Sequence, residues 1–424
     1  MKSGREKQLS LRKLLFLMAA SLLIAGILWA FWPAIQCWRV RSMLAAGDLN
    51  AAHLVASQTA ASYAGCGECF YLQARANRRL GHFDEAETAL RRASELQWNS
   101  ADILREQVLS VAQRGGIASV ERRLQEVFRS DLGSTETNEV YEAMAYGHLA
   151  AFDIPEFLKC IAFWLEWNPP AIAPRMMRAD YYRRVGNFSE AAKDYSAIAQ
   201  ADSSQHGARL GWGECLLNQN RPDEAIEQLQ WCLDDQPAAG TAVLLAKALI
   251  QVGRNDEAGA VLKRFQEDPN VEKRGEVLEQ LGRWHFDRGQ TIEAEAILKL
   301  SVAAAPESAS AWHALASVQT KLGNLDGARN SLATSQDVQA RVSRLAELIN
   351  ELSSRPKELP QRIEAAQILF EQGMNSDAVA WLKTVLAQDL HHVQANQLLA
   401  EFYEKNGQPE LANQHRHLGN LPLP

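Results

Sequence analysis

One short pattern returns along the chain: Gly, any residue, a bulky apolar residue, two polar residues and Ala. It reads RRLGHFDEAETALRRA at Arg78–Ala93 and RRVGNFSEAAKDYSAI at Arg183–Ile198. Aligned on the Gly, the copies are separated by 34, 34, 37, 34, 34, 33, 36, 34, 50 and 34 residues. A period this regular predicts repeated units that stack on one another. The aligned positions are Gly47, Gly81, Gly115, Phe152, Gly186, Asn220, Gly253, Gly289, Gly323, Gly373 and Gly407.

Each unit has the pattern of a helical hairpin. Apolar or small residues at helical spacing precede the Gly, as in Ala311–Gly323, and a second helical stretch follows it, as in Ala294–Pro306. Gly at the junction permits the left-handed backbone that ends a helix, and Asn is the usual second choice. The Ala suits a place where two helices cross closely, and it recurs at positions 52, 86, 191, 225, 258, 294, 328, 378 and 412.

These features together resemble the tetratricopeptide repeat. The resemblance extends from about residue 34 to residue 420 and implies an all-α, right-handed superhelical solenoid of about ten to eleven helical hairpins. In that family the concave surface, built mostly from first helices, binds an extended peptide or a partner helix. The fullest matches are Trp312, Leu315, Ala316, Gly323, Leu325 and Ala328 in one unit, Leu281, Gly282, Gly289, Ala294 and Pro306 in a second, and Trp212, Gly213, Ala225 and Pro237 in a third.

Two departures from the period divide the array. The fourth unit has Phe152 in place of the Gly and Phe157 in place of the Ala, so its hairpin should open more widely or shift. The interval of 50 residues holds an insertion with apolar residues at helical spacing, which predicts a lengthened helix that ends near Ser353, before Pro356. We therefore expect about nine units over residues 34–342, a helical insertion over residues 343–358, and two units with a tail over residues 359–424.

The N-terminal segment differs from the rest. Residues 1–13 form a basic tail with five basic residues and one Glu, and residues 14–33 are uncharged and long enough to span a bilayer. A secretory signal peptide is the alternative, but the apolar run is longer than usual and lacks a small-x-small cleavage site. We expect a transmembrane anchor at residues 14–33, with the N-terminus cytoplasmic and the repeats extracytoplasmic, periplasmic or equivalent.

Composition and motifs restrict the function. The formal net charge of −7 argues against a general nucleic-acid binder, which needs a surplus of Lys and Arg. The chain has no Gly-x-Ser-x-Gly elbow, His-Glu-x-x-His motif, phosphate-binding loop or calcium loop. We therefore expect no catalytic activity, no cofactor and no metal.

The resemblance implies a partner-binding groove on the first helices. In an acidic protein, an Arg-lined groove could hold an acidic segment through bidentate contacts; the alternative is that these residues are solvated or paired with one another. Acidic residues are expected to interleave with the basic residues of the groove, namely Glu139, Glu142, Asp180, Glu279, Glu364 and Glu401. The expected groove residues are Tyr71, Arg75, Arg78, Arg79, Arg105, Tyr146, Met176, Arg183, Arg184, Lys247 and Arg283.

Cysteines suggest one further site. Cys66 and Cys69 are the only close pair, and on an oxidising side of the membrane they could form a disulfide. Zinc would need two more ligands, which the sequence does not place at a recognised spacing. Phe70 stands where a c-type haem would need His. Cys37, Cys160, Cys215 and Cys232 lie within helical patterns and are interpreted as buried apolar residues.

Three functions are consistent with these observations. The first is a membrane-anchored scaffold that binds a protein partner through the groove. The second is a chaperone-like assembly factor that holds exported polypeptides or subunits, and the third is an accessory subunit of an enzyme or redox complex.

Overall fold

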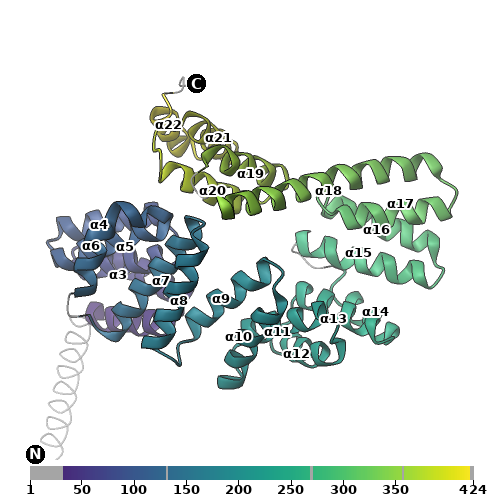
Figure 1. Ribbon diagram of the computed structural model, residues 1–424, viewed down its shortest axis with the longest axis horizontal. Helices are drawn as coiled ribbons and strands as arrows, with labels where there is room; N and C mark the ends of the chain where they lie inside the picture. The colour runs from purple at the N-terminus through teal and green to yellow at the C-terminus, as the bar shows by residue number, and fades with distance from the viewer. Residues whose placement is uncertain (1–31, 130–131, 268–270, 356–357, 421–424) are drawn as a thin grey trace, which may run out of the picture. The chain divides into compact units, whose positions relative to one another are not determined.

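Helical hairpins make up the chain in the computed structural model, which describes residues 32–129, 132–267, 271–355 and 358–420 (Figure 1). Every regular element in these ranges is a helix. The first hairpin joins a helical segment that includes residues 32–46 to α2 (Leu49–Ser62). The next two pair α3 (Gly67–Arg79) with α4 (Phe83–Glu95), and α5 (Ser100–Val111) with α6 (Ile117–Arg129) through a π-helical turn η1 (Ala112–Gly116). The fourth repeat contains α7 (Ser134–Ala150) and α8 (Ile154–Trp167), joined by the turn at Phe152.

Seven further hairpins follow. They pair α9 (Ile172–Arg184) with α10 (Phe188–Ala201), α11 (His206–Asn218) with α12 (Pro222–Asp235), α13 (Ala239–Gln251) with α14 (Asn255–Lys263), α15 (Val271–Asp287) with α16 (Thr291–Ala304), α17 (Ala309–Lys321) with α18 (Leu325–Ser354), α19 (Leu359–Glu371) with α20 (Asn375–Leu386), and α21 (Val393–Lys405) with α22 (Pro409–Leu418). The expected all-helical solenoid of repeated hairpins is therefore confirmed.

The turns have the backbone that the repeat pattern predicts. All eleven aligned positions have a positive φ, including Phe152 at 59° and Asn220 at 57°. The residue after the left-handed position often begins the second helix as its N-cap. The side chains of Asn187 and Asn324, for example, accept hydrogen bonds from the backbone N–H groups of Glu190 and Gly327. Such a cap stabilises a helix by about 1 kcal/mol.

Close packing within each hairpin explains the recurring small residues. The nine aligned alanines are all buried, with exposed fractions of 0% to 8%. On the first helices, a Cβ added at Gly213 would lie 2.8 Å from Leu229 Cγ, and one added at Gly282 would lie 2.5 Å from Leu298 Cγ. The hairpins can pack this closely only because these positions have little or no side chain.

The chain divides into two compact units between Gly147 and His148. Unit 1 ends within α7, in the repeat whose sequence departs from the pattern, and unit 2 contains α8 and the later hairpins. Each unit has apolar cores of its own, such as the cluster around Leu72 and Leu90 in unit 1 and the cluster around Leu229 and Leu245 in unit 2.

The insertion after the ninth turn belongs to the 30-residue helix α18, which ends at Ser354. Val338, Leu348 and Leu352 are buried along it, whereas Val342 and Ile349 are exposed. The extra residues therefore lengthen an existing second helix and add no separate element before residue 355.

The expected basic tail at 1–13 and most of the expected anchor at 14–33 lie outside the described residues. Among the helices that the structure does describe, none combines the length and apolar character needed to cross a bilayer.

Candidate partner-binding surfaces

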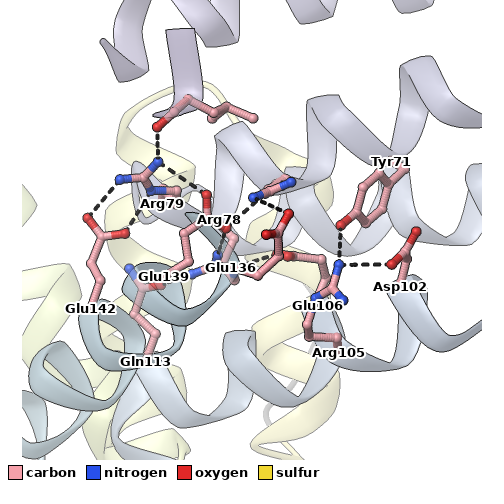
Figure 2. A network of polar contacts seen from close by, with 12 residues as sticks. Tyr71, Arg78, Arg79, Asp102, Arg105, Glu106, Gln113, Glu136, Glu139 and Glu142 are labelled. Atoms are coloured by element: carbon pink, nitrogen blue, oxygen red, sulfur yellow. Dashed lines mark hydrogen bonds and ion pairs between the residues drawn. The ribbon is translucent and has the colours of Figure 1, made fainter. Parts of the chain in front are cut away.

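Three first helices of unit 1 bring the expected groove arginines together with glutamates. Arg78 on α3 donates from Nε to Glu106 Oε2 on α5 (2.6 Å), and from Nη2 to Glu139 Oε2 on α7 (3.2 Å). Its Nη1 donates to Gln113 Oε1 at 2.9 Å. Arg75 Nε donates to the same Glu139 oxygen at 2.8 Å. Figure 2 shows Arg78 and its partners Glu106, Gln113 and Glu139 converging between the helices.

Arg79 and Arg105 extend this network on either side. Arg79 makes a two-pronged contact with Glu142, at 2.7 Å and 3.2 Å, and donates to the backbone carbonyl of Leu44 at 2.6 Å. Arg105 Nη2 donates to Tyr71 Oη at 2.9 Å and to Asp102 Oδ1 at 2.8 Å (Figure 2). The Tyr71 ring also stacks on Trp98.

Burial sets the electrostatics of this network. Arg75, Arg78, Glu106, Glu139 and Glu142 are at most 8% exposed. Burial on its own would raise the pKa of Glu139, but the guanidinium groups of Arg75, Arg78 and Arg79 lie close enough to hold that pKa below its ordinary value. Burial raises the pKa of Tyr71. The network therefore contains ionised, mutually paired groups.

Unit 1 thus corrects part of the groove prediction. The expected residues do converge from successive first helices, but Tyr71, Arg75 and Arg78 are buried and their polar groups are satisfied within the chain. They do not line an open surface, because Glu139 and Glu142 of α7 occupy the position that an acidic partner would take. The alternative that the charged residues pair with one another holds for this unit.

The other expected residues have varied surroundings. Tyr146 on α7 is 41% exposed, and Met176 on α9 packs partly buried against an apolar cluster. Arg183 contacts Glu214 (3.2 Å) and Tyr195 Oη (3.2 Å), and Arg283 contacts Glu279 (3.1 Å) and the Ser310 carbonyl. Arg184 and Lys247 are exposed.

A hollow of about 510 Å³ lies on three consecutive first helices of unit 2. It contains the expected residue Lys247, and amide side chains are frequent in its lining. It is lined by Glu214, Leu217 and Asn218 of α11, Leu244, Lys247, Ile250 and Gln251 of α13, and Gln280 of α15.

A larger hollow of about 760 Å³ lies between the first helices α19 and α21. Its walls combine apolar and aromatic side chains with three carboxylates and one ammonium group, and the Phe370 and Phe402 rings stack at 5.3 Å. Glu364 is held by Arg344 at 2.7 Å, whereas Glu371 and Glu401 are exposed and make no ion pair within the described ranges. The lining residues are Glu364, Gln367, Ile368, Phe370, Glu371, Asn375, Leu398, Glu401, Phe402, Lys405 and Asn406.

Sequence reasoning named Glu364 and Glu401 only as residues interleaved with a basic groove, and it missed Phe370 and Phe402. The repeat pattern gives no signal for this pair, because Phe370 stands three positions before Gly373 whereas Phe402 stands five positions before Gly407, so the two are not equivalent positions of their repeats.

The cysteine pair lies at the start of α3. Cys66 and Cys69 form a disulfide in the structure. The Cys66 side chain is also the N-cap of α3 and accepts a hydrogen bond from the Cys69 backbone N–H at 3.2 Å. Cys160, Cys215 and Cys232 are buried, as is Cys37.

Family models of the tetratricopeptide repeat match residues 67–97, 176–230 and 216–272, which correspond to α3–α4 and α9–α14. The chain therefore contains tetratricopeptide repeats. No curated protein matches it.

Among solved structures, one of MamA is 20% identical with a TM-score of 0.32, covering 40% of this chain and 98% of the MamA chain. A structure of YrrB, titled as a TPR protein with an unusual peptide-binding site, is 20% identical with a TM-score of 0.33, covering 42% of this chain and 92% of the YrrB chain.

Proposed function

We propose that the protein is a non-catalytic interaction scaffold whose partner-binding surface is the hollow between α19 and α21. The observation that carries this proposal is the combination in one hollow of a stacked aromatic pair with exposed carboxylates, Glu371 and Glu401, that have no ion-pair partner among the described residues. The occupant is a segment of a protein partner.

The chemistry of the lining specifies the kind of segment. Phe370, Phe402 and Leu398 offer apolar surface for one or two side chains of the partner. Glu371 and Glu401 flank that surface and favour Lys or Arg, with only Lys405 opposing them. The occupant is therefore a basic segment with apolar anchors, which reverses the charge that was expected of the partner. The arginines of unit 1, which had suggested an acidic partner, are instead paired with glutamates of the chain.

Reversing the charge of the hollow should abolish this binding. We expect the full-length protein to select, from a random peptide library, sequences in which Lys or Arg alternates with Leu or Phe. Glu371→Lys/Glu401→Lys should weaken binding of a selected peptide at least tenfold, measured by fluorescence anisotropy, because like charges then face each other.

Glu293→Lys/Glu307→Lys is the matched control, since it makes the same charge change at exposed positions outside the hollow. It should leave the affinity within twofold. Equal losses in both variants would show a nonspecific charge effect, and selection of acidic peptides would refute the proposed occupant. In cells, a photo-crosslinking residue at Gln367 should give one major adduct; a ladder of many weak adducts would instead favour the assembly-factor hypothesis.

We also propose that residues 14–33 anchor the protein with its repeats outside the cytoplasm. This rests on the uncharged run and on the five basic residues that precede it. Protease added to cells with a permeabilised outer layer should digest the repeats and leave the first dozen or so residues protected. Complete protection of the repeats, while a known extracytoplasmic protein is digested, would overturn this orientation.

A further inference from the structure

Three cysteines of unit 1 lie together although the sequence separates them. Cys37 comes from the helical segment at 32–46, and Cys66 and Cys69 come from the start of α3. Cys37 Sγ is 3.5 Å from Cys69 Sγ, and all three sulfur atoms lie within 4.8 Å of one another. Cys37 and Cys69 are 2% and 1% exposed, whereas Cys66 is only partly buried, so one edge of the cluster can be reached from solvent.

The shape of this cluster separates two possible roles. In thiol–disulfide exchange, the Cys37 thiolate would attack Cys69 in line with the S–S bond, which requires the outer sulfurs to be about 5.5 Å apart, the 3.5 Å approach plus a bond of about 2.05 Å. Cys37 Sγ and Cys66 Sγ, which would be the outer sulfurs, lie within 4.8 Å of each other and are too close for that arrangement. Once the disulfide is reduced, the cluster instead suits a metal ion, because Zn–S bonds of about 2.3 Å in a tetrahedron place the sulfurs about 3.8 Å apart. Cys37 Sγ already lies 3.5 Å from Cys69 Sγ.

Polar groups at the start of α3 would stabilise negatively charged sulfur ligands at Cys66 and Cys69. The Cys69 N–H already donates to Cys66 Sγ, and the N-terminus of α3 adds its positive end. Arg41 pairs with Glu68, between the two α3 cysteines, at 2.7 Å.

We propose that the reduced thiols of Cys37, Cys66 and Cys69 bind one thiophilic d10 metal ion, Zn²⁺ or Cu⁺. Soft thiolates select these ions. No other His, Cys, Asp or Glu in the described ranges completes the cluster, so the fourth position is open to water or an external ligand. Metal binding and the Cys66–Cys69 disulfide are alternative states, because the disulfide uses two of the three sulfurs. Reduction of the disulfide to two thiols takes two electrons and two protons. A dithiol supplies both and becomes a disulfide, whereas a phosphine supplies the electrons and becomes the phosphine oxide, with the oxygen atom and the protons coming from water.

The test uses the full-length protein, reduced with a phosphine without oxygen and freed of metal. Titrations with Zn²⁺ and with Cu⁺, each against a chromogenic chelator, identify the preferred ion. We expect one equivalent to bind. Cys37→Ser should weaken the affinity more than tenfold, whereas Cys160→Ser and Cys215→Ser, which remove buried thiols elsewhere, should leave it unchanged.

Two further measurements distinguish the loss of a metal ligand from misfolding of a variant. Co²⁺ should give thiolate charge-transfer absorption whose intensity falls by about a third when one of three thiolate ligands is lost. Cys66→Ser removes a ligand and leaves a good N-cap residue on α3, so it should fold, as circular dichroism will check. The proposal is overturned if the reduced wild type binds neither ion stoichiometrically, or if Cys37→Ser binds as the wild type does.

Discussion

Replacing Arg78 with Met is expected to lower the free energy of unfolding of unit 1 by about 3–5 kcal/mol, because removing one partner of a buried ion pair leaves the other charge uncompensated. Arg78 is 1% exposed and is the only described residue that forms an ion pair with Glu106, which would then be buried without one. Hydrogen exchange of α3 and α7 peptides measures this unit separately, and their protection should fall by about two to three and a half orders of magnitude.

Two variants show whether the ion pair causes the loss. Arg184→Met removes an exposed arginine from α9 and should change stability by less than about 0.5 kcal/mol. Arg78→Met/Glu106→Leu removes both charges and should recover part of the loss, since apolar residues can replace a buried ion pair at little cost. If the double variant is as unstable as Arg78→Met, or if Arg78→Met loses less than about 1 kcal/mol, the ion pair does not stabilise unit 1 in this way.

Gly147→Ala is expected to have the second largest effect. A Cβ at Gly147 would lie 2.1 Å from the backbone carbonyl oxygen of Ala112 in η1, and a backbone atom cannot rotate away as a side chain can. α7 would have to move, and with it Glu139 and Glu142, which pair with the arginines of α3. Overpacking of this kind costs about 1–3 kcal/mol, occasionally more, and here it also disturbs the ionic network.

The matched control is Gly207→Ala, a second glycine within a helix. Its added Cβ would meet nothing nearer than Met176 Cε at 4.0 Å, so the change should stabilise α11 by about 0.5–1 kcal/mol. Urea unfolding monitored by hydrogen exchange compares the two variants. A Gly147→Ala protein as stable as the wild type would mean that α7 and η1 do not pack this closely in solution.

The repeat pattern predicts the hairpins well because each depends on neighbouring residues. Asn220 has the expected left-handed backbone without Gly, and the aligned alanines are buried. Phe152, where a departure from the repeat was expected, has the same left-handed backbone. These features follow from a local turn and from one helix crossing the next.

The site depends on more distant geometry. Arg75 pairs with Glu139, which lies 64 positions later in the sequence. The curvature of the stack of hairpins determines whether these two residues meet, and a 34-residue period does not specify that curvature. The helical pattern around Cys37 indicates only a buried apolar residue, and it does not show that Cys66 and Cys69 lie beside it. Both partnerships depend on the packing of helices from different hairpins, and the local pattern carries little information about that packing.

The network of unit 1 also bears on how that unit folds. In most solenoids a repeat contacts only its neighbours, so terminal repeats can fray while the others persist. Here the α3 arginines pair directly with glutamates of α7, two hairpins away, and Arg79 also binds the carbonyl of Leu44 in the first hairpin. Loss of the hairpin with α3, or of α7, would leave the charges on the other without their ion-pair partners. Unit 1 is thereby made cooperative, and it cannot be shortened by whole repeats as a simple solenoid can.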